Sequence, residues 1–304
     1  MKTDDDGGTS SDIEDRRGQG SRAGGLGGLP IGRGGAALSL PVLIIVVIVS
    51  IIGGKSLGGG GGGGFDIGNV FNQLQPAPSA VPGSNRVPGA TDPQADAVKF
   101  VSFVLDDTQK FWAAQMGADY RKAKLVLYTD GVNTGGCGSA TSAAGPFYCP
   151  GDEKVYLDLS FFDELATKFG ASGDFAQAYV IAHELGHHIQ KVTGVNDKVR
   201  QQQEANPTKA NELSVRLELQ ADCFAGVWGY STYDRGILES GDLEEGLNAA
   251  TRVGDDYIQK NLGNGQIRPD LFTHGTSTQR MKWFKTGFDS GDAAKCDTFS
   301  VSNP

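Results

Sequence analysis

A run of seven consecutive glycines, Gly58–Gly64, divides the chain into two parts of different character. Such a run behaves as a flexible coil, so a packed element cannot continue through it. Of the 45 glycines in the chain, 23 lie before residue 96, whereas the composition from Asp96 onward is that of an ordinary globular protein. The remaining part is long enough for one sizeable hydrophobic core. We therefore expect one folded domain over residues 96–304.

The charge of this domain excludes some classes of partner. From Asp96 onward the sequence holds 20 Lys and Arg residues against 28 Asp and Glu residues. A protein that binds nucleic acid normally presents a basic face to the phosphates. The acidic balance predicts that the domain has no nucleic-acid partner and does not adhere to anionic lipid.

The N-terminal stretch, residues 1–35, mixes acidic and basic residues with many glycines and lacks aromatic side chains. A segment of this composition buries too little apolar surface to offset its ordering entropy. We expect it to be a disordered tail.

A run of 17 uncharged residues follows, Ala36–Ile52, with the sequence AALSLPVLIIVVIVSII. It reaches the lower length limit of a membrane-spanning helix, and Gly-rich sequence on both sides offers nothing for it to pack against. We predict a single transmembrane helix over 36–52. A cleaved signal peptide and a buried core element are the alternatives, although the sequence after the run lacks a clear A-x-A cleavage site.

The basic residues near this run predict its orientation. Arg17, Arg22 and Arg33 precede it, and only Lys55 follows closely. The positive-inside rule then leaves the N-terminus in the cytoplasm and places the domain outside the cell membrane. The Gly- and Pro-rich residues 53–95 would form a linker that holds the domain away from the membrane surface.

Four cysteines lie in the part expected outside the cytoplasm, and none forms a C-x-x-C pair. An even number of cysteines in an oxidising compartment suggests two disulfides. Pairing Cys137 with Cys149 would close a short loop, and pairing Cys223 with Cys296 would tie the C-terminal tail to a central helix. All three possible pairings stay open, as does the alternative of four reduced, buried thiols.

Hydrophobic periodicity predicts an α+β domain that is mostly helical with a small sheet. Ser160 is the expected N-cap of the second helix, and Ser277 or Thr278 that of the last. Helices are expected at 96–115, 161–169, 175–192, 208–230, 242–262 and 277–288, and strands at 124–128 and 153–159.

The segment VIAHELGHHIQ, residues 180–190, contains H-E-x-x-H and lies in the helix expected at 175–192. Positions i and i+4 lie on one helix face, so His183 and His187 can bind the same zinc ion. Glu184 lies beside them and can take a proton from a zinc-bound water. Two surface histidines on a solvated helix are the alternative, which the apolar neighbours disfavour.

A catalytic zinc ion needs a third protein ligand and an open position. The extended motif with a third histidine is excluded, because Gln190 and Thr193 stand where it requires Gly and His. Downstream, the segment RLELQADCFAG places Glu218 and Asp222 on one face of an apolar helix. We predict Glu218 as the third ligand and Asp222 as the partner of a ligating histidine. Weaker candidate ligands are Glu212, Asp255 and Asp256.

Two further histidines remain. His188 points elsewhere on the helix and is predicted to be structural or to support a ligand. His274 could donate a hydrogen bond to the oxyanion that forms when water attacks a peptide carbonyl, or it could hold a loop. Tyr156 and Tyr179 are further candidate donors.

The motifs together resemble those of the bacterial putative neutral zinc metallopeptidase family. The resemblance covers nearly the whole chain except the Gly/Pro linker, and it implies a zincin-like domain with His183, His187 and Glu218 as zinc ligands and Glu184 as general base. The segments that carry it are EDRRGQG (Glu14–Gly20), Cys137–Phe162, HELGHHIQ, ELQADCFAGVW, VGDDYIQ, FTHGTSTQR and CDTF.

We therefore predict a membrane-anchored, zinc-dependent peptidase that binds one zinc ion and acts on a peptide or protein. The strand 153–159 is expected to be an edge strand that aligns an extended peptide by backbone pairing. Two rival functions stay open: a zinc-stabilised surface domain that binds peptides without cleaving them, and an amide hydrolase that acts on cell-wall peptides.

Overall fold

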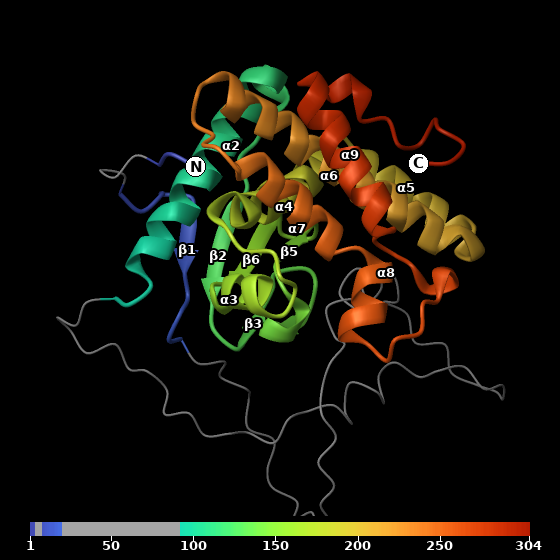
Figure 1. Ribbon diagram of the computed structural model, residues 1–304, viewed down its shortest axis with the longest axis horizontal. Helices are drawn as coiled ribbons and strands as arrows, with labels where there is room; N and C mark the ends of the chain where they lie inside the picture. The colour runs from blue at the N-terminus through green and yellow to red at the C-terminus, as the bar shows by residue number, and fades with distance from the viewer. Residues whose placement is uncertain (4–7, 20–91) are drawn as a thin grey trace, which may run out of the picture.

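Helices dominate the part of the chain that the computed structural model describes, residues 1–3, 8–19 and 92–304 (Figure 1). Short 3-10 turns and one π-helical turn, Ile258–Leu262, connect them. The helices are α2 (Ala95–Met116), α3 (Ser160–Thr167), α4 (Asp174–Val192), α5 (Val195–Ala205), α6 (Ala210–Asp234), α7 (Asp242–Arg252), α8 (Asp255–Tyr257) and α9 (Ser277–Ser290).

The main sheet has four strands in the order β1-β2-β6-β5. Its first three strands are parallel, and β5 pairs with β6 antiparallel. A small hairpin of β3 and β4 stands apart from this sheet. The strands are β1 (Ile13–Asp15), β2 (Lys124–Tyr128), β3 (Gly131–Asn133), β4 (Ser139–Thr141), β5 (Phe147–Cys149) and β6 (Lys154–Asp158). The α+β class, mostly helical with a small sheet, is confirmed.

The two faces of the sheet are covered differently. Leu125 and Leu127 of β2 belong to the large helical core, together with α4 residues such as Tyr179. Val126 and Tyr128 point to the other face, into a smaller cluster that includes Val132 of the hairpin. The alternation follows from the two-residue period of a strand. Both faces of β2 are therefore buried.

Strand β1 corrects the prediction of a disordered tail over residues 1–35. Ile13–Asp15 pairs in parallel with Leu125–Leu127, at the edge of the sheet next to α2 (Figure 1). The prediction was wrong for this stretch because it considered apolar burial alone. The segment is instead held by backbone pairing and by charge: Asp12 lies 2.8 Å from Lys122 Nζ.

Two helix predictions needed correction. The sequence predicted one helix over 208–230, whereas α5 also forms before it. The helix predicted over 242–262 is broken at Gly254, whose backbone is extended with ψ 144°. Any Cβ at Gly254 would collide with the backbone of Ser277, so the break lets α9 begin close to α8.

Helix caps also differ from those expected. Helix α3 begins at Ser160, and its N-cap is Leu159. For α9 the cap is Thr276, one residue before the predicted pair, and it forms a capping box with Gln279. Such reciprocal bonds satisfy two backbone N–H groups at the start of the helix.

Helices α6 and α9 pack closely because two glycines lie between them. A Cβ at Gly226 would collide with the carbonyl of Phe284, and one at Gly287 with the carbonyl of Cys223. The disulfide Cys223–Cys296 joins α6 to the segment after α9, and the disulfide Cys137–Cys149 closes a loop that ends in β5. These are the two pairings that the sequence analysis considered first.

Among residues 1–3, 8–19 and 92–304, no helix is long and apolar enough to cross a membrane. The predicted span, 36–52, and the linker as far as residue 91 lie outside the described residues.

Candidate zinc site

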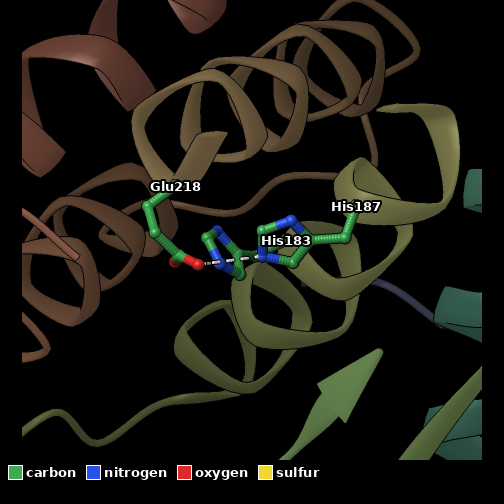
Figure 2. A group of neighbouring side chains, drawn as sticks. All are labelled: His183, His187 and Glu218. Atoms are coloured by element: carbon green, nitrogen blue, oxygen red, sulfur yellow. Dashed lines mark hydrogen bonds and ion pairs between the residues drawn. The ribbon is translucent and has the colours of Figure 1, made fainter. Parts of the chain in front are cut away.

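Two helices that pack against each other position the site. His183 and His187 lie on one face of α4, and Glu218 reaches toward them from α6 (Figure 2). Gly186, between the two histidines, allows this approach, since a Cβ there would lie 3.0 Å from the Cα of Ala221. The glycine of the motif therefore serves the helix packing that brings the third side chain to the pair.

The distances within this triad fit a zinc ion. Glu218 Oε2 lies 3.2 Å from His183 Nε2, and Glu218 Oε1 lies 3.4 Å from His187 Nε2. One ligand atom from each residue can be chosen so that all three lie within 4.8 Å of one another. Tetrahedral zinc with bonds of about 2.0–2.2 Å separates neighbouring ligand atoms by about 3.3–3.6 Å. Two imidazoles and one carboxylate also form a donor set that zinc prefers, so the residues present fit the metal.

Asp222, one helical turn after Glu218, orients the first histidine. Its Oδ1 lies 2.9 Å from His183 Nδ1, which leaves Nε2 to face the site. Tyr179 donates a hydrogen bond of 2.6 Å to the same oxygen. Arg280, from α9, donates from Nε and Nη2 to the two carboxylate oxygens, at 2.9 Å each. This network fixes the tautomer and ring plane of His183.

His187 is oriented by a different group. Its Nδ1 lies 2.9 Å from Gln190 Oε1, and the Gln190 amide donates in turn to the carbonyl of Leu217. Both histidines therefore keep Nε2 toward Glu218 and use Nδ1 for a supporting hydrogen bond.

The charges of the site shift several pKa values. Burial alone would raise the pKa of Glu218, but the nearby His187 and His274 outweigh it and hold that pKa well below its ordinary range. Burial would lower the pKa of His183, yet the Asp222 carboxylate raises it to about 9. The carboxylates of the site thus stabilise positive charge, as the binding of a divalent cation requires.

Glu184 lies between the two histidines in sequence and lines the same cavity. It is 8% exposed, and burial raises the pKa of its carboxyl group. Unlike Glu218, this carboxylate makes no hydrogen bond or ion pair with another residue in the described part of the chain. It is therefore available to a water molecule or a substrate.

His274 enters the cavity from the loop before α9. Its Nδ1 lies 3.0 Å from Asp255 Oδ1, and Asp255 Oδ2 also accepts the backbone N–H of His274. The buried Asp255 thus holds both the loop and the ring. Burial would lower the pKa of His274, but Glu218 and Asp255 outweigh it and raise that pKa. His274 therefore holds the loop, which is one of the two roles predicted for it. It also lies in the cavity, which the other role, hydrogen bonding to an oxyanion, requires.

The cavity has a volume of about 390 Å³, and its lining includes His183, Glu184, His187, Glu218 and His274. Strand β5 borders it through Phe147 and Tyr148. Since β5 is the last strand of the sheet, it is the edge beside the cavity. The expectation that strand 153–159 is the edge was wrong: β6 lies between β2 and β5, and both of its sides are paired.

The remaining candidates lie away from the metal position. His188 is buried, donates from Nε2 to the Arg121 carbonyl and accepts from the Tyr148 hydroxyl, so it supports β5 as a structural residue. Tyr156 donates to Asp152. Among the weaker candidate ligands, Glu212 pairs with Arg216, Asp255 holds His274, and Asp256 accepts two hydrogen bonds from Ser277.

Sequence reasoning missed Arg280 and Gln190 as parts of the site. Arg280 is 4% exposed and lies 58 residues beyond the Asp222 that it binds. An arginine within an amphipathic helix is normally a surface residue. The only signal for it was indirect: the buried Asp222 requires a positively charged partner.

The chain is similar to known proteins over nearly its whole length. Residues 4–299 match the family model described as "Putative neutral zinc metallopeptidase". The chain is 49% identical over 300 residues to the uncharacterized protein YpfJ of Escherichia coli K12, covering 96% of this chain and 97% of that protein. It is 39% identical over 257 residues to the uncharacterized protein Rv2575 of Mycobacterium tuberculosis H37Rv, covering 79% of this chain and 85% of that one. No solved structure matches.

Proposed function

Because the chain belongs to the putative neutral zinc metallopeptidase family, we propose that it is a zinc-dependent peptidase that hydrolyses peptide bonds. His183, His187 and Glu218 would hold the metal. The observation that carries the proposal is the buried carboxylate of Glu184, which borders the cavity beside that triad without a partner of its own among the described residues.

When bound, zinc would supply a Lewis acid that polarises the scissile carbonyl and lowers the pKa of a bound water to about 7. Glu184 acts as the general base: it takes the proton of the attacking water and later delivers it to the leaving amine. Its burial favours this exchange, because a raised carboxyl pKa brings the group closer to neutral pH.

His274 stabilises the oxyanion that forms on the carbonyl oxygen. Asp255 holds the ring by Nδ1, so Nε2 is the nitrogen that serves a ligand in the cavity. A positively charged or hydrogen-bonding imidazole at this position lowers the energy of the transition state more than that of the substrate.

Strand β5 aligns the substrate. An extended peptide can pair with a sheet edge through its backbone, independently of its side chains. The disulfide Cys137–Cys149 and the hydrogen bond from Tyr148 to His188 hold this edge in place. This arrangement suits an unfolded or extended segment of a protein better than a small amide.

The two disulfides also support a location outside the cytoplasm, where such bonds persist. We propose that the domain acts there.

The experiment is cleavage of a peptide library by the purified, zinc-loaded full chain, compared with the variants Glu184→Gln and Glu212→Gln. We expect the wild type and Glu212→Gln to cleave, and Glu184→Gln to lose activity by at least 100-fold while it keeps its zinc. Equal cleavage by all three would show that Glu184 is not the base. Absence of cleavage, with one zinc bound per chain, would favour a peptide-binding domain; cleavage of purified cell-wall peptides alone would favour an amide hydrolase of that class.

A further inference from the structure

More than 100 residues separate strand β1 from β2 in the sequence, and they include residues 20–91 with the predicted membrane span. It is nevertheless an integral part of the fold. Its register with β2 covers three residue pairs, and the pairing continues on both sides: the Leu125 N–H donates to the Asp12 carbonyl and the Arg16 N–H to the Leu127 carbonyl.

Side chains fix the segment as firmly as its backbone does. Asp12 is 5% exposed and receives charge-assisted hydrogen bonds from Lys122 and Lys124. Glu14 Oε1 lies 2.6 Å from Lys154 Nζ of β6. Ser10 bonds both Ser102 and Asp106 of α2. Separation of this segment from the domain would break both ion pairs of the buried carboxylate.

The two ends of the intervening stretch meet at one place. Arg17, after β1, donates to Asp92 Oδ2 at 2.7 Å and to Gln94 Oε1 at 2.9 Å, just before α2 begins. The residues that flank the undescribed stretch therefore lie close together.

We propose that residues 8–19 and the domain from Asp92 onward lie on the same side of any membrane that the chain contacts. Two strands that share backbone hydrogen bonds must share a compartment. A cytoplasmic N-terminal tail and an exported domain, as the sequence predicts, would lie on opposite sides of a membrane and could not form this pairing.

The direct test is labelling of the full chain in intact cells with a membrane-impermeant maleimide. One variant carries Gln19→Cys, beside β1, and the other carries Lys282→Cys, on α9; both positions are exposed. The parent chain is the control, because its four cysteines are paired.

The proposal predicts that both thiols react alike, either in intact cells or only after permeabilisation. Reaction of one in intact cells and of the other only after permeabilisation would overturn it. Reaction of both only after permeabilisation would support the shared compartment while contradicting the extracytoplasmic location proposed above, so the two ideas fail separately.

A charge-reversal series tests the docking itself in the purified full chain. Glu14→Lys should expose the bonds after Arg16 and Arg17 to trypsin, with cleavage at least 10-fold faster than in the wild type. The double variant Glu14→Lys with Lys154→Glu should restore most of the protection. Equally slow cleavage of the wild type and the single variant, or equally fast cleavage of all three proteins, would show that β1 is not held by this pairing.

Discussion

Asp222 offers the sharpest test of how the zinc site is held together. Its carboxylate is fully buried and binds three side chains: Arg280 through two oxygens, Tyr179, and His183. The variant Asp222→Asn keeps the shape and one acceptor oxygen but removes the charge. Its amide NH₂ would then face the N–H groups of Arg280 in place of an acceptor.

The magnitude follows from the geometry. Two unit charges about 4 Å apart interact by about 4 kcal/mol at an effective dielectric constant of 20. Loss of one partner from a buried ion pair costs about 3–5 kcal/mol. We expect the metal-free Asp222→Asn protein to lose an amount of this order from its free energy of unfolding. Zinc affinity should fall about 10–100-fold, because His183 loses the anion that orients it.

The assays are urea denaturation of the metal-free protein and zinc competition against a chromophoric chelator. Asp256→Asn is the matched control: it keeps the Oδ1 atom that accepts from Ser277 but removes the negative charge at the start of α9. This loss costs at most about 1 kcal/mol and should leave zinc affinity unchanged. Wild-type zinc affinity in Asp222→Asn, at unchanged stability, would refute the role assigned to this carboxylate.

Three further predictions concern the fold. Gly287→Ala should destabilise the protein by about 1–3 kcal/mol or more, since the new methyl group meets the backbone of α6; thermal unfolding measures this, and an unchanged melting temperature would contradict the packing. Cys296→Ser opens the disulfide with a sequence separation of 73 and should cost about 4 kcal/mol of unfolding free energy, whereas Cys137→Ser, with a sequence separation of 12, should cost about 3 kcal/mol. The reverse order of stability in denaturation experiments would contradict the dependence on loop length. Burial would raise the pKa of Asp12, but its two lysine partners outweigh burial and lower that pKa below the ordinary 3.8, so the charge of Asp12 stabilises the fold above about pH 4 and this contribution is lost as the pH falls through the lowered pKa. The difference in unfolding free energy between the wild type and Asp12→Asn should therefore be largest near pH 6 and shrink below pH 4. A difference that stays constant with pH would argue against the ion pairs.

The zinc site could be predicted largely because its chemistry is local. His183, Glu184 and His187 lie within one helical turn, and Glu218 with Asp222 within another. His183 and His187 therefore share one helix face, and Glu218 and Asp222 share another, independently of the rest of the fold. One long-range contact is also required, between the two helices, and Gly186 in the motif permits that approach.

The parts that were missed depend on contacts between distant segments. The pairing of β1 with β2 joins residues more than 100 positions apart, and Arg280 reaches Asp222 across the α6–α9 interface. Composition could not distinguish a polar segment that stays in solution from one with a side chain that is buried and ion-paired, as Asp12 is. The edge of the sheet was misassigned for the same reason, since the order of strands is set by tertiary pairing and β5 is only three residues long.

We propose a zinc site with three protein ligands and an open position. X-ray absorption spectroscopy of the zinc-loaded full chain tests this arrangement. We expect two imidazole nitrogens at about 2.0–2.1 Å with one carboxylate and one water oxygen at about 2.0–2.2 Å, and loss of the carboxylate in Glu218→Ala. A sulfur ligand at about 2.3 Å, or an unchanged coordination shell in Glu218→Ala, would contradict it.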